Sequence, residues 1–185
     1  MNSSTYRNLI AFDLISKFQI KSVDGLPLLL SGHLNINEQD FGSREELVAF
    51  YSAFSGLFHN SKPQFSFIKK FVAKFRVQKG DLHGLSFTFS ASAAFNFLTA
   101  LLIFYPPILA KLGLELKLNV SNNGVATVLI PDLKLHPFLE GNAVTFLSRF
   151  IPGTFVIKFS NISSAKRLLI LMSAFTPLQL NVQRE

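Results

Sequence analysis

The chain has 185 residues, of which 49% are hydrophobic and 21 are phenylalanine, and it contains no cysteine. This length is enough for a sizeable hydrophobic core and predicts a single domain over residues 1–185. The absence of cysteine excludes disulfides, thiolate metal sites and a cysteine nucleophile. The net charge of +7, from 18 basic and 11 acidic residues, favours a polyanionic partner.

Hydrophobic periodicity divides the chain into ten predicted helices and strands. Apolar residues at i, i+3 and i+4 predict helices, and alternation of apolar and polar residues predicts strands. Ser43 and Glu46 have the spacing of a capping box, and Ser92 and Ser163 are predicted caps of later helices. The predicted elements are helix 6–18, strand 28–37, helix 43–57, strand 85–90, helix 92–105, strands 114–120 and 125–130, helix 142–150, strand 155–159 and helix 165–175.

This order of elements predicts an α+β fold, an antiparallel sheet with helices packed on one face. The other face of the sheet, together with a basic loop, would then face a partner. On two predicted strands, the polar positions opposite the core carry short hydrogen-bonding side chains. These are His33, Asn35 and Asn37 on the first strand, and Ser86, Thr88 and Ser90 on the second.

Residues 84–110 form an uncharged run of 27 residues, which is long enough to cross a bilayer. Its first part alternates like a strand, and its second part has helical periodicity that Pro106 and Pro107 are predicted to end. About 14 helical residues span roughly 21 Å, which is shorter than the hydrocarbon layer of about 30 Å. We therefore predict a core helix and no membrane span. The alternative is a small organellar membrane protein anchored through this run.

The basic residues gather in one segment that carries no acidic residue, between Glu46 and Asp81. A cluster of positive charges without acidic residues favours a nucleic-acid partner. The alternatives are a patch that keeps the protein in solution and a contact with an anionic membrane. Six of the chain's 18 basic residues lie there: Lys62, Lys69, Lys70, Lys74, Arg76 and Lys79.

No pattern of catalytic or metal-binding chemistry is present in the sequence. The four histidines lack the spacing of a metal site, and there is no dinucleotide, Walker or nucleophile-elbow motif. The 11 acidic residues are spread thinly, without a pair arranged for acid–base work. We predict a protein without catalytic residues, metal site or cofactor.

Several short motifs resemble one family in order and spacing. Ser61-Lys62-Pro63, the segment KKFVAKFRVQKGDLHG at 69–84, and the closing Ser173-Ala174-Phe175 resemble successive motifs of bacterial-type large-subunit ribosomal protein five. That family binds 5S rRNA in the central protuberance of the ribosome. The resemblance runs nearly end to end, and from Ser61 to Pro107 its motifs follow without gaps.

The resemblance implies rRNA, tRNA and protein partners and assigns residues to them. Beyond 5S-type and large-subunit rRNA, it implies contacts with P-site tRNA through a loop at about 69–84, with neighbouring central-protuberance proteins and with the small-subunit head. The implied rRNA-binding residues are Asn35, Ser61, Lys62, Lys69, Lys70 and Thr88. The implied residues of the tRNA loop are Lys74, Phe75, Arg76, Lys79, Gly80 and Gly84.

The chain departs from the family at several positions where the family has arginine. With fewer guanidinium groups, the chain can form fewer bidentate hydrogen bonds to phosphate. A phenylalanine-rich, arginine-poor version predicts a ribosome of the mitochondrial matrix, ahead of a plastid or a reduced bacterium. Because the family-like helix starts at Tyr6, we further expect a copy encoded in the mitochondrion. The replaced positions are Ser90, Ala93, Ala100, Ile108 and Asn123.

Overall fold

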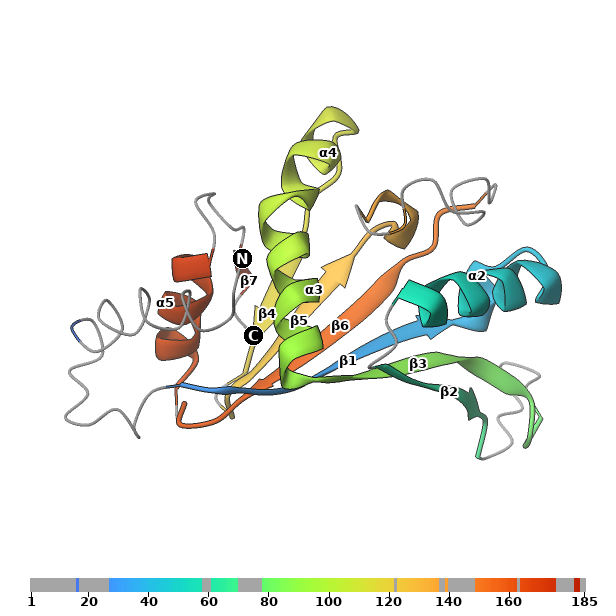
Figure 1. Ribbon diagram of the computed structural model, residues 1–185, viewed down its shortest axis with the longest axis horizontal. Coiled ribbons are helices and arrows are strands. Elements are labelled where there is room, and N and C mark those ends of the chain that lie inside the picture. The colour runs from blue at the N-terminus through green and yellow to red at the C-terminus, as the bar shows by residue number, and fades with distance from the viewer. Residues whose placement is uncertain are drawn as a thin grey trace.

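The fold is an antiparallel sheet with helices over one face, which confirms the predicted α+β class (Figure 1). The computed structural model describes residues 16, 27–57, 61–69, 78–121, 123–136, 139, 149–162, 164–175 and 182–183. Its elements are β1 Leu29–Asn37, η2 Glu38–Asp40, α2 Arg44–Leu57, β2 Ser61–Phe67, β3 Leu82–Ser90, α3 Ala91–Ile103, α4 Tyr105–Lys111, β4 Lys117–Val120, β5 Val125–Ile130, η4 Leu133–Leu135, β6 Gly153–Phe159, α5 Ala165–Phe175 and β7 Val182–Gln183.

The described strands form one sheet in the order β2-β3-β1-β6-β5-β4-β7. All neighbours are antiparallel except β4 and the short β7, which run parallel. Strand β1 lies between β3 and β6, and Asn35 is opposite Ser86 on one side and Thr154 on the other. Residues more than a hundred positions apart thus become cross-strand neighbours.

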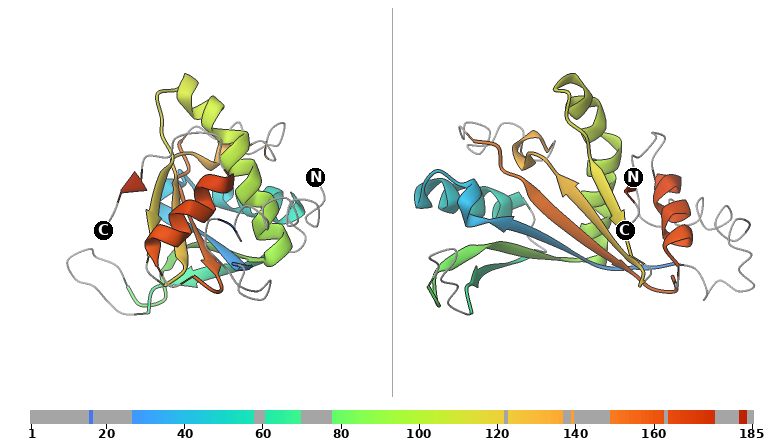
Figure 2. Two further views of the ribbon diagram at one scale, coloured as in Figure 1. Left: turned by 90° about the vertical axis from the view of Figure 1, so that its left-hand side faces the viewer. Right: turned by 180° about the vertical axis from the view of Figure 1, so that it is seen from behind.

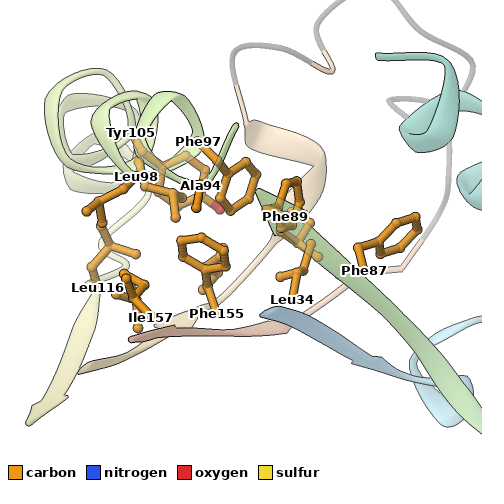
Figure 3. Packing of buried hydrophobic residues seen from close by; sticks show 14 of the residues in the cluster. Leu34, Phe87, Phe89, Ala94, Phe97, Leu98, Tyr105, Leu116, Phe155 and Ile157 are labelled. Carbon is orange, nitrogen blue, oxygen red and sulfur yellow. The ribbon is translucent and has the colours of Figure 1, made fainter. Parts of the chain in front are cut away.

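The core lies between the sheet and α3, which crosses over the central strands (Figures 1 and 2). Phe97 of α3 is fully buried, stacked on Phe89 of β3 at 5.3 Å between ring centroids and edge-on to Phe155 of β6 at 4.7 Å (Figure 3). Such offset and T-shaped pairs are the favoured arrangements of aromatic rings. The buried aromatic side chains of β3 and β6 therefore project toward the helices.

The uncharged run 84–110 is divided between a strand and two helices. Strand β3 passes into α3 with no connecting residue, and Ser90 is the N-cap. The predicted cap, Ser92, instead lies in the first turn of α3, and its hydroxyl oxygen is 3.4 Å from that of Ser90. The helix α3 ends at Ile103, two residues before its predicted end at Tyr105, but Pro106 and Pro107 do not stop the helical run. Both prolines lie in the first turn of α4. Backbone N–H groups in a first turn have no acceptor within the helix, so the missing N–H of proline removes no helical hydrogen bond.

Within the described part of the chain, one helical stretch is long and apolar enough to cross a membrane. It is Ala91–Lys111, with 21 residues and a mean hydropathy of 1.7. The buried side chains of α3 follow helical spacing and pack on the sheet, as expected for a core helix. They are Ala94, Phe97, Leu98, Ala100, Leu101 and Leu102.

Two other sequence predictions concern helix starts. The predicted N-cap of α2 is confirmed, since Glu46 N donates to Ser43 Oγ at 3.2 Å. The return bond of the predicted capping box is displaced by one residue, because the Glu46 carboxylate accepts from Gly42 N at 2.8 Å. At α5 the cap hydrogen bond, from Arg167 N at 3.4 Å, goes to Ser164 Oγ. The predicted cap Ser163 and almost all of the predicted helices 6–18 and 142–150 lie outside the described residues.

A buried polar cluster ties α4 to the segment around η4. The Tyr105 hydroxyl donates to the Asp132 carbonyl, and the Asp132 carboxylate accepts from Ile151 N at 3.1 Å and Lys134 N at 3.2 Å. Burial raises the pKa of both Tyr105 and Asp132. Nearby, the buried His136 ring stacks on Phe97 at 4.6 Å. These contacts hold the apolar helices to the sheet, and we assign them a structural role.

Gly84 provides a test of the sheet packing. A side-chain Cβ at this position would lie 2.0 Å from the Ile36 carbonyl oxygen, so Gly84→Ala must shift the backbone of β1 or β3. We expect a loss of unfolding free energy of at least about 1–3 kcal/mol, measured by urea denaturation. Gly42→Ala is the matched control, because its Cβ would meet only the flexible end of Glu46 at 3.0 Å. Equal stability of the two variants would contradict this packing.

His136 provides a pH test of the core. Burial lowers its pKa to about 4 from the ordinary 6.5, against the opposite effect of a hydrogen bond with the Phe97 backbone. Because the unfolded chain takes up the proton first, the unfolding free energy should fall as pH drops from about 6.5 to about 4, by up to about 3 kcal/mol. Urea titrations of the parent chain and His136→Phe across this range would measure the difference. His83→Gln, at an exposed histidine, is the control, and an unchanged slope in His136→Phe would refute the assignment.

Candidate nucleic-acid interface

The face of the sheet opposite the helices carries polar and short side chains. Along each strand, alternate residues are buried toward the helices, and the residues between them lie on this second face, called here the open face. Its residues on β1, β3, β6, β5 and β4 are Ser31, His33, Asn35, Asn37, Ser86, Thr88, Ser90, Thr154, Val156, Lys158, Val125, Thr127, Leu129, Lys117 and Asn119.

Strand register arranges the open face in two parallel rows that cross six strands. Side chains directly opposite each other in such rows lie about 4.5–5.5 Å apart at Cβ, and diagonal neighbours about 7–8 Å apart. The predicted residues Asn35 and Thr88 are therefore close together, in adjacent rows. One row is Thr88, His33, Val156, Thr127 and Asn119, and the other is Gln64, Ser86, Asn35, Thr154, Leu129 and Lys117. In the register of β2, Lys62 pairs with Thr88.

The hydroxyl of Thr88 is oriented by a neighbouring histidine. His33 Nδ1 and Thr88 Oγ1 are 3.2 Å apart, and His33 Nε2 lies 3.5 Å from Ser31 Oγ. The sequence placed His33 on the polar face but did not indicate this pairing. The Thr88 hydroxyl is thus within hydrogen-bond distance of the His33 ring.

Ser61, implied by the resemblance to bind rRNA, lies three residues before a glutamine on the same strand. Ser61 pairs in register with Phe89, and Gln64 is opposite Ser86 on the open face. Gln64 is exposed and was missed because β2 was not predicted as a strand. The alternation of Lys62, Gln64 and Ser66 with apolar residues was the signal that could have found it.

A basic hollow of about 650 Å³ lies at the end of the open face formed by β2, β3 and the turn between them. The exposed Lys69 and Lys79 line it together with Asn35, and none of its described lining residues is acidic. It is a site where an anion would meet two ammonium groups and several hydrogen-bonding groups. The remaining lining residues are Gln64, Phe65, Ser66, Phe67, Ile68, Gly80 and Ser86.

Backbone hydrogen bonds hold the two lysines of the hollow near each other. Ile68 N donates to the Asp81 carbonyl, and Gly80 N donates to the Ile68 carbonyl, both at 2.9 Å. Gly80 has a φ of +95°, a conformation that L side chains rarely adopt, and the turn closes where Gln78 N donates to the Asp81 carboxylate at 2.7 Å. The Asp81 carboxylate is thus engaged by its own turn.

Other parts of the open face are less favourable to an anion. A second hollow, of about 330 Å³, is lined by Lys117 but also by Asp40 and Glu115. Burial raises the pKa of Asp40, against a hydrogen bond to the Asn37 backbone. The second hollow therefore carries both signs of charge. Of the two hollows, the one at the β2–β3 end is the more favourable to an anion.

The structure gathers only part of the predicted site. Asn35, Lys69, Lys79 and Gly80 line one hollow, and Thr88 lies in the neighbouring row. Gly84 was predicted in the tRNA loop, but it is buried in β3 beside Ile36, where only a glycine fits. Ser61 and Lys62 are described by their strand register, and the remaining four predicted residues lie outside the described part of the chain. These are Lys70, Lys74, Phe75 and Arg76.

Comparison with known proteins finds one informative likeness. No protein-family model matches the chain. Over 145 residues it is 23% identical to the large ribosomal subunit protein uL5c of Cyanidioschyzon merolae, covering 76% of this chain and 78% of that protein. The chain is therefore similar to a protein of the large ribosomal subunit over most of its length, which agrees with the family that its motifs resemble.

Proposed function

We propose that this protein is a structural, non-catalytic constituent of the large subunit of an organellar ribosome, which binds rRNA on its open face. The basic hollow carries the proposal, because Lys69 and Lys79 meet the amide of Asn35 there. Phosphate oxygens need cationic and short hydrogen-bonding partners of this kind. The likeness to the large-subunit protein uL5c supports the same assignment.

The finer form of the proposal follows the family resemblance. The rRNA would be 5S-type and large-subunit rRNA in the central protuberance, and the loop at about 69–84 would meet P-site tRNA. Neighbouring proteins and the small-subunit head would complete its contacts. The arginine-poor, phenylalanine-rich composition favours the mitochondrial matrix over a plastid.

The rival function, a membrane protein anchored through 84–110, is less well supported. Seven residues of that run belong to β3, and the following helix buries its apolar side chains against the sheet. A membrane span would have to remove α3, and with it Phe97, from the core. The two functions therefore require different folds and can be separated by fractionation.

Charge reversal in the hollow tests the interface. Lys69→Glu with Lys79→Glu should weaken binding of the chain to rRNA fragments and lower the slope of log affinity against log salt by about two. Filter binding between about 50 and 200 mM salt measures both quantities. Lys111→Glu with Lys166→Glu has the same charge change at exposed sites on α4 and α5 and should retain the parent slope. Identical loss in both variants would show that net charge alone acts.

Sedimentation tests the assembly and the compartment. A tagged chain from detergent-solubilised mitochondria should move with the large ribosomal subunit in a sucrose gradient at moderate magnesium. Removing magnesium with EDTA should disperse it together with subunit rRNA. Recovery only in light membrane complexes would favour the rival function, and recovery with plastid subunits would correct the compartment.

A further inference from the structure

We propose that a groove between α2 and the β2–β3 hairpin docks a short segment of a partner protein, and that this segment carries both apolar and basic side chains. The groove, called here the docking groove, is a hollow of about 710 Å³. It lies on the helix-covered side of the hairpin, opposite the open face. The inference goes beyond the proposed function and does not depend on RNA binding.

The docking groove opens where the β2–β3 hairpin bends away from α2 (Figures 1 and 2). Farther along α2, helix and sheet are in contact, since Tyr51 stacks on Phe65 of β2 at 5.2 Å between ring centroids. Toward the turn of the hairpin, the hollow separates the start of α2 from the ends of the two strands. The groove therefore has α2 as one wall and the hairpin as the other.

Both walls of the docking groove expose large apolar side chains. Val48 of α2 is 57% exposed, and Phe65 and Phe67 of β2 are 41% and 58% exposed. Exposed apolar side chains scattered singly over a surface are ordinary, but these three line the same hollow. A partner that inserts apolar side chains between the two walls would remove these surfaces from water, which favours association.

The charge around the docking groove indicates that the partner is basic. Four of the chain's 11 acidic residues lie at positions 38–46, where Arg44 is the one basic residue. Of these four, Glu38 lines the groove, and Asp81 lines it from the hairpin. In a chain with a net charge of +7, this corner is locally negative. It attracts lysine and arginine side chains and repels phosphate.

The two sides of the hairpin are thus lined by charges of opposite sign. Of the described residues, Lys69 and Lys79 line the basic hollow on the open face but not the docking groove, and Glu38 and Asp81 line the groove but not the basic hollow. A polyanion that fits the basic hollow would be repelled from the groove. The groove therefore suits a polypeptide, and the two partners could bind the hairpin at the same time.

Peptide binding to the full-length chain tests the docking groove. The probe is a fluorescein-labelled peptide of alternating leucine and lysine residues, and two comparison peptides have glutamate in place of lysine or serine in place of leucine. Fluorescence anisotropy should show binding of the leucine–lysine peptide and at least about tenfold weaker binding of both comparison peptides. Val48→Ser with Glu38→Gln should weaken binding of the leucine–lysine peptide about tenfold, because an apolar contact and a charge are lost together.

The matched control is Leu112→Ser with Glu115→Gln. It removes one exposed apolar side chain and one exposed carboxylate from the segment between α4 and β4, and it should bind the peptide like the parent chain. Phe67→Ser, on the other wall of the groove, is a second test variant and should also weaken peptide binding. Circular dichroism melting checks that each variant is folded.

Several outcomes would overturn the inference. They are equal binding of all three peptides, an equal loss of affinity in the control variant, and no binding at peptide concentrations up to about 1 mM. The variant Val48→Ser with Glu38→Gln should keep the parent affinity for rRNA fragments, and loss of that affinity would assign the groove to RNA instead. Self-association of the parent chain in sedimentation equilibrium, abolished by the same two substitutions, would identify a second copy of this chain as the occupant.

Discussion

The packing of α3 across the centre of the sheet is the interaction on which the rest of the structure depends. Its Phe97 ring meets Phe89, Phe155 and His136, with centroid distances of 5.3, 4.7 and 4.6 Å. Because β3 runs into α3 without a loop, the helix is tied to the strands that it covers. Burial is therefore one-sided, and the opposite face of the sheet keeps its polar side chains accessible.

The geometry of the open face follows from the register of the core. Side chains alternate between faces, so a slip of one residue would exchange the buried and open sets of a strand. Burial of Leu34 and Ile36 forces Asn35 outward, and pairing with β3 brings it opposite Ser86. The absence of a side chain at Gly84 allows the close approach that maintains this pairing. The packing that buries Leu34 and Ile36 therefore also determines which side chains lie on the open face.

Most helices and strands of the described residues could be predicted from the sequence, because the spacing of apolar residues shows which face of each element is buried. Alternation identified β1 and β3, and the N-cap Ser43 located the start of α2. Strand β2 was missed because Pro63 and the flanking lysines resemble a loop, although Pro63 is compatible with β2's position at the edge of the sheet.

The parts of the site that depend on non-local pairing could not be predicted. Prolines can follow the end of a helix or lie in the first turn of the next, and here both occur, since α3 ends at Ile103 and α4 begins at Tyr105. That β6 lies beside β1, and that Gln64 rather than Ser61 is opposite Ser86, follows from strand register. No pattern within a short stretch of the chain contains this information. The hollow formed by Lys69, Lys79 and Asn35 depends on the same pairing.

The described cations that line the basic hollow are lysines, which limits how the proposed interface could hold RNA. Lysine is a point charge without the bidentate geometry of guanidinium, so Lys69 and Lys79 attract phosphate without fixing its orientation. Orientation must then come from the short side chains of the open face, whose hydrogen bonds have directional preferences. Because Asn35, Gln64, Ser86 and Thr88 belong to three paired strands, their spacing is set by the sheet. In the proposed function, a rigid array of weak, directional contacts would thus replace a few strong ones.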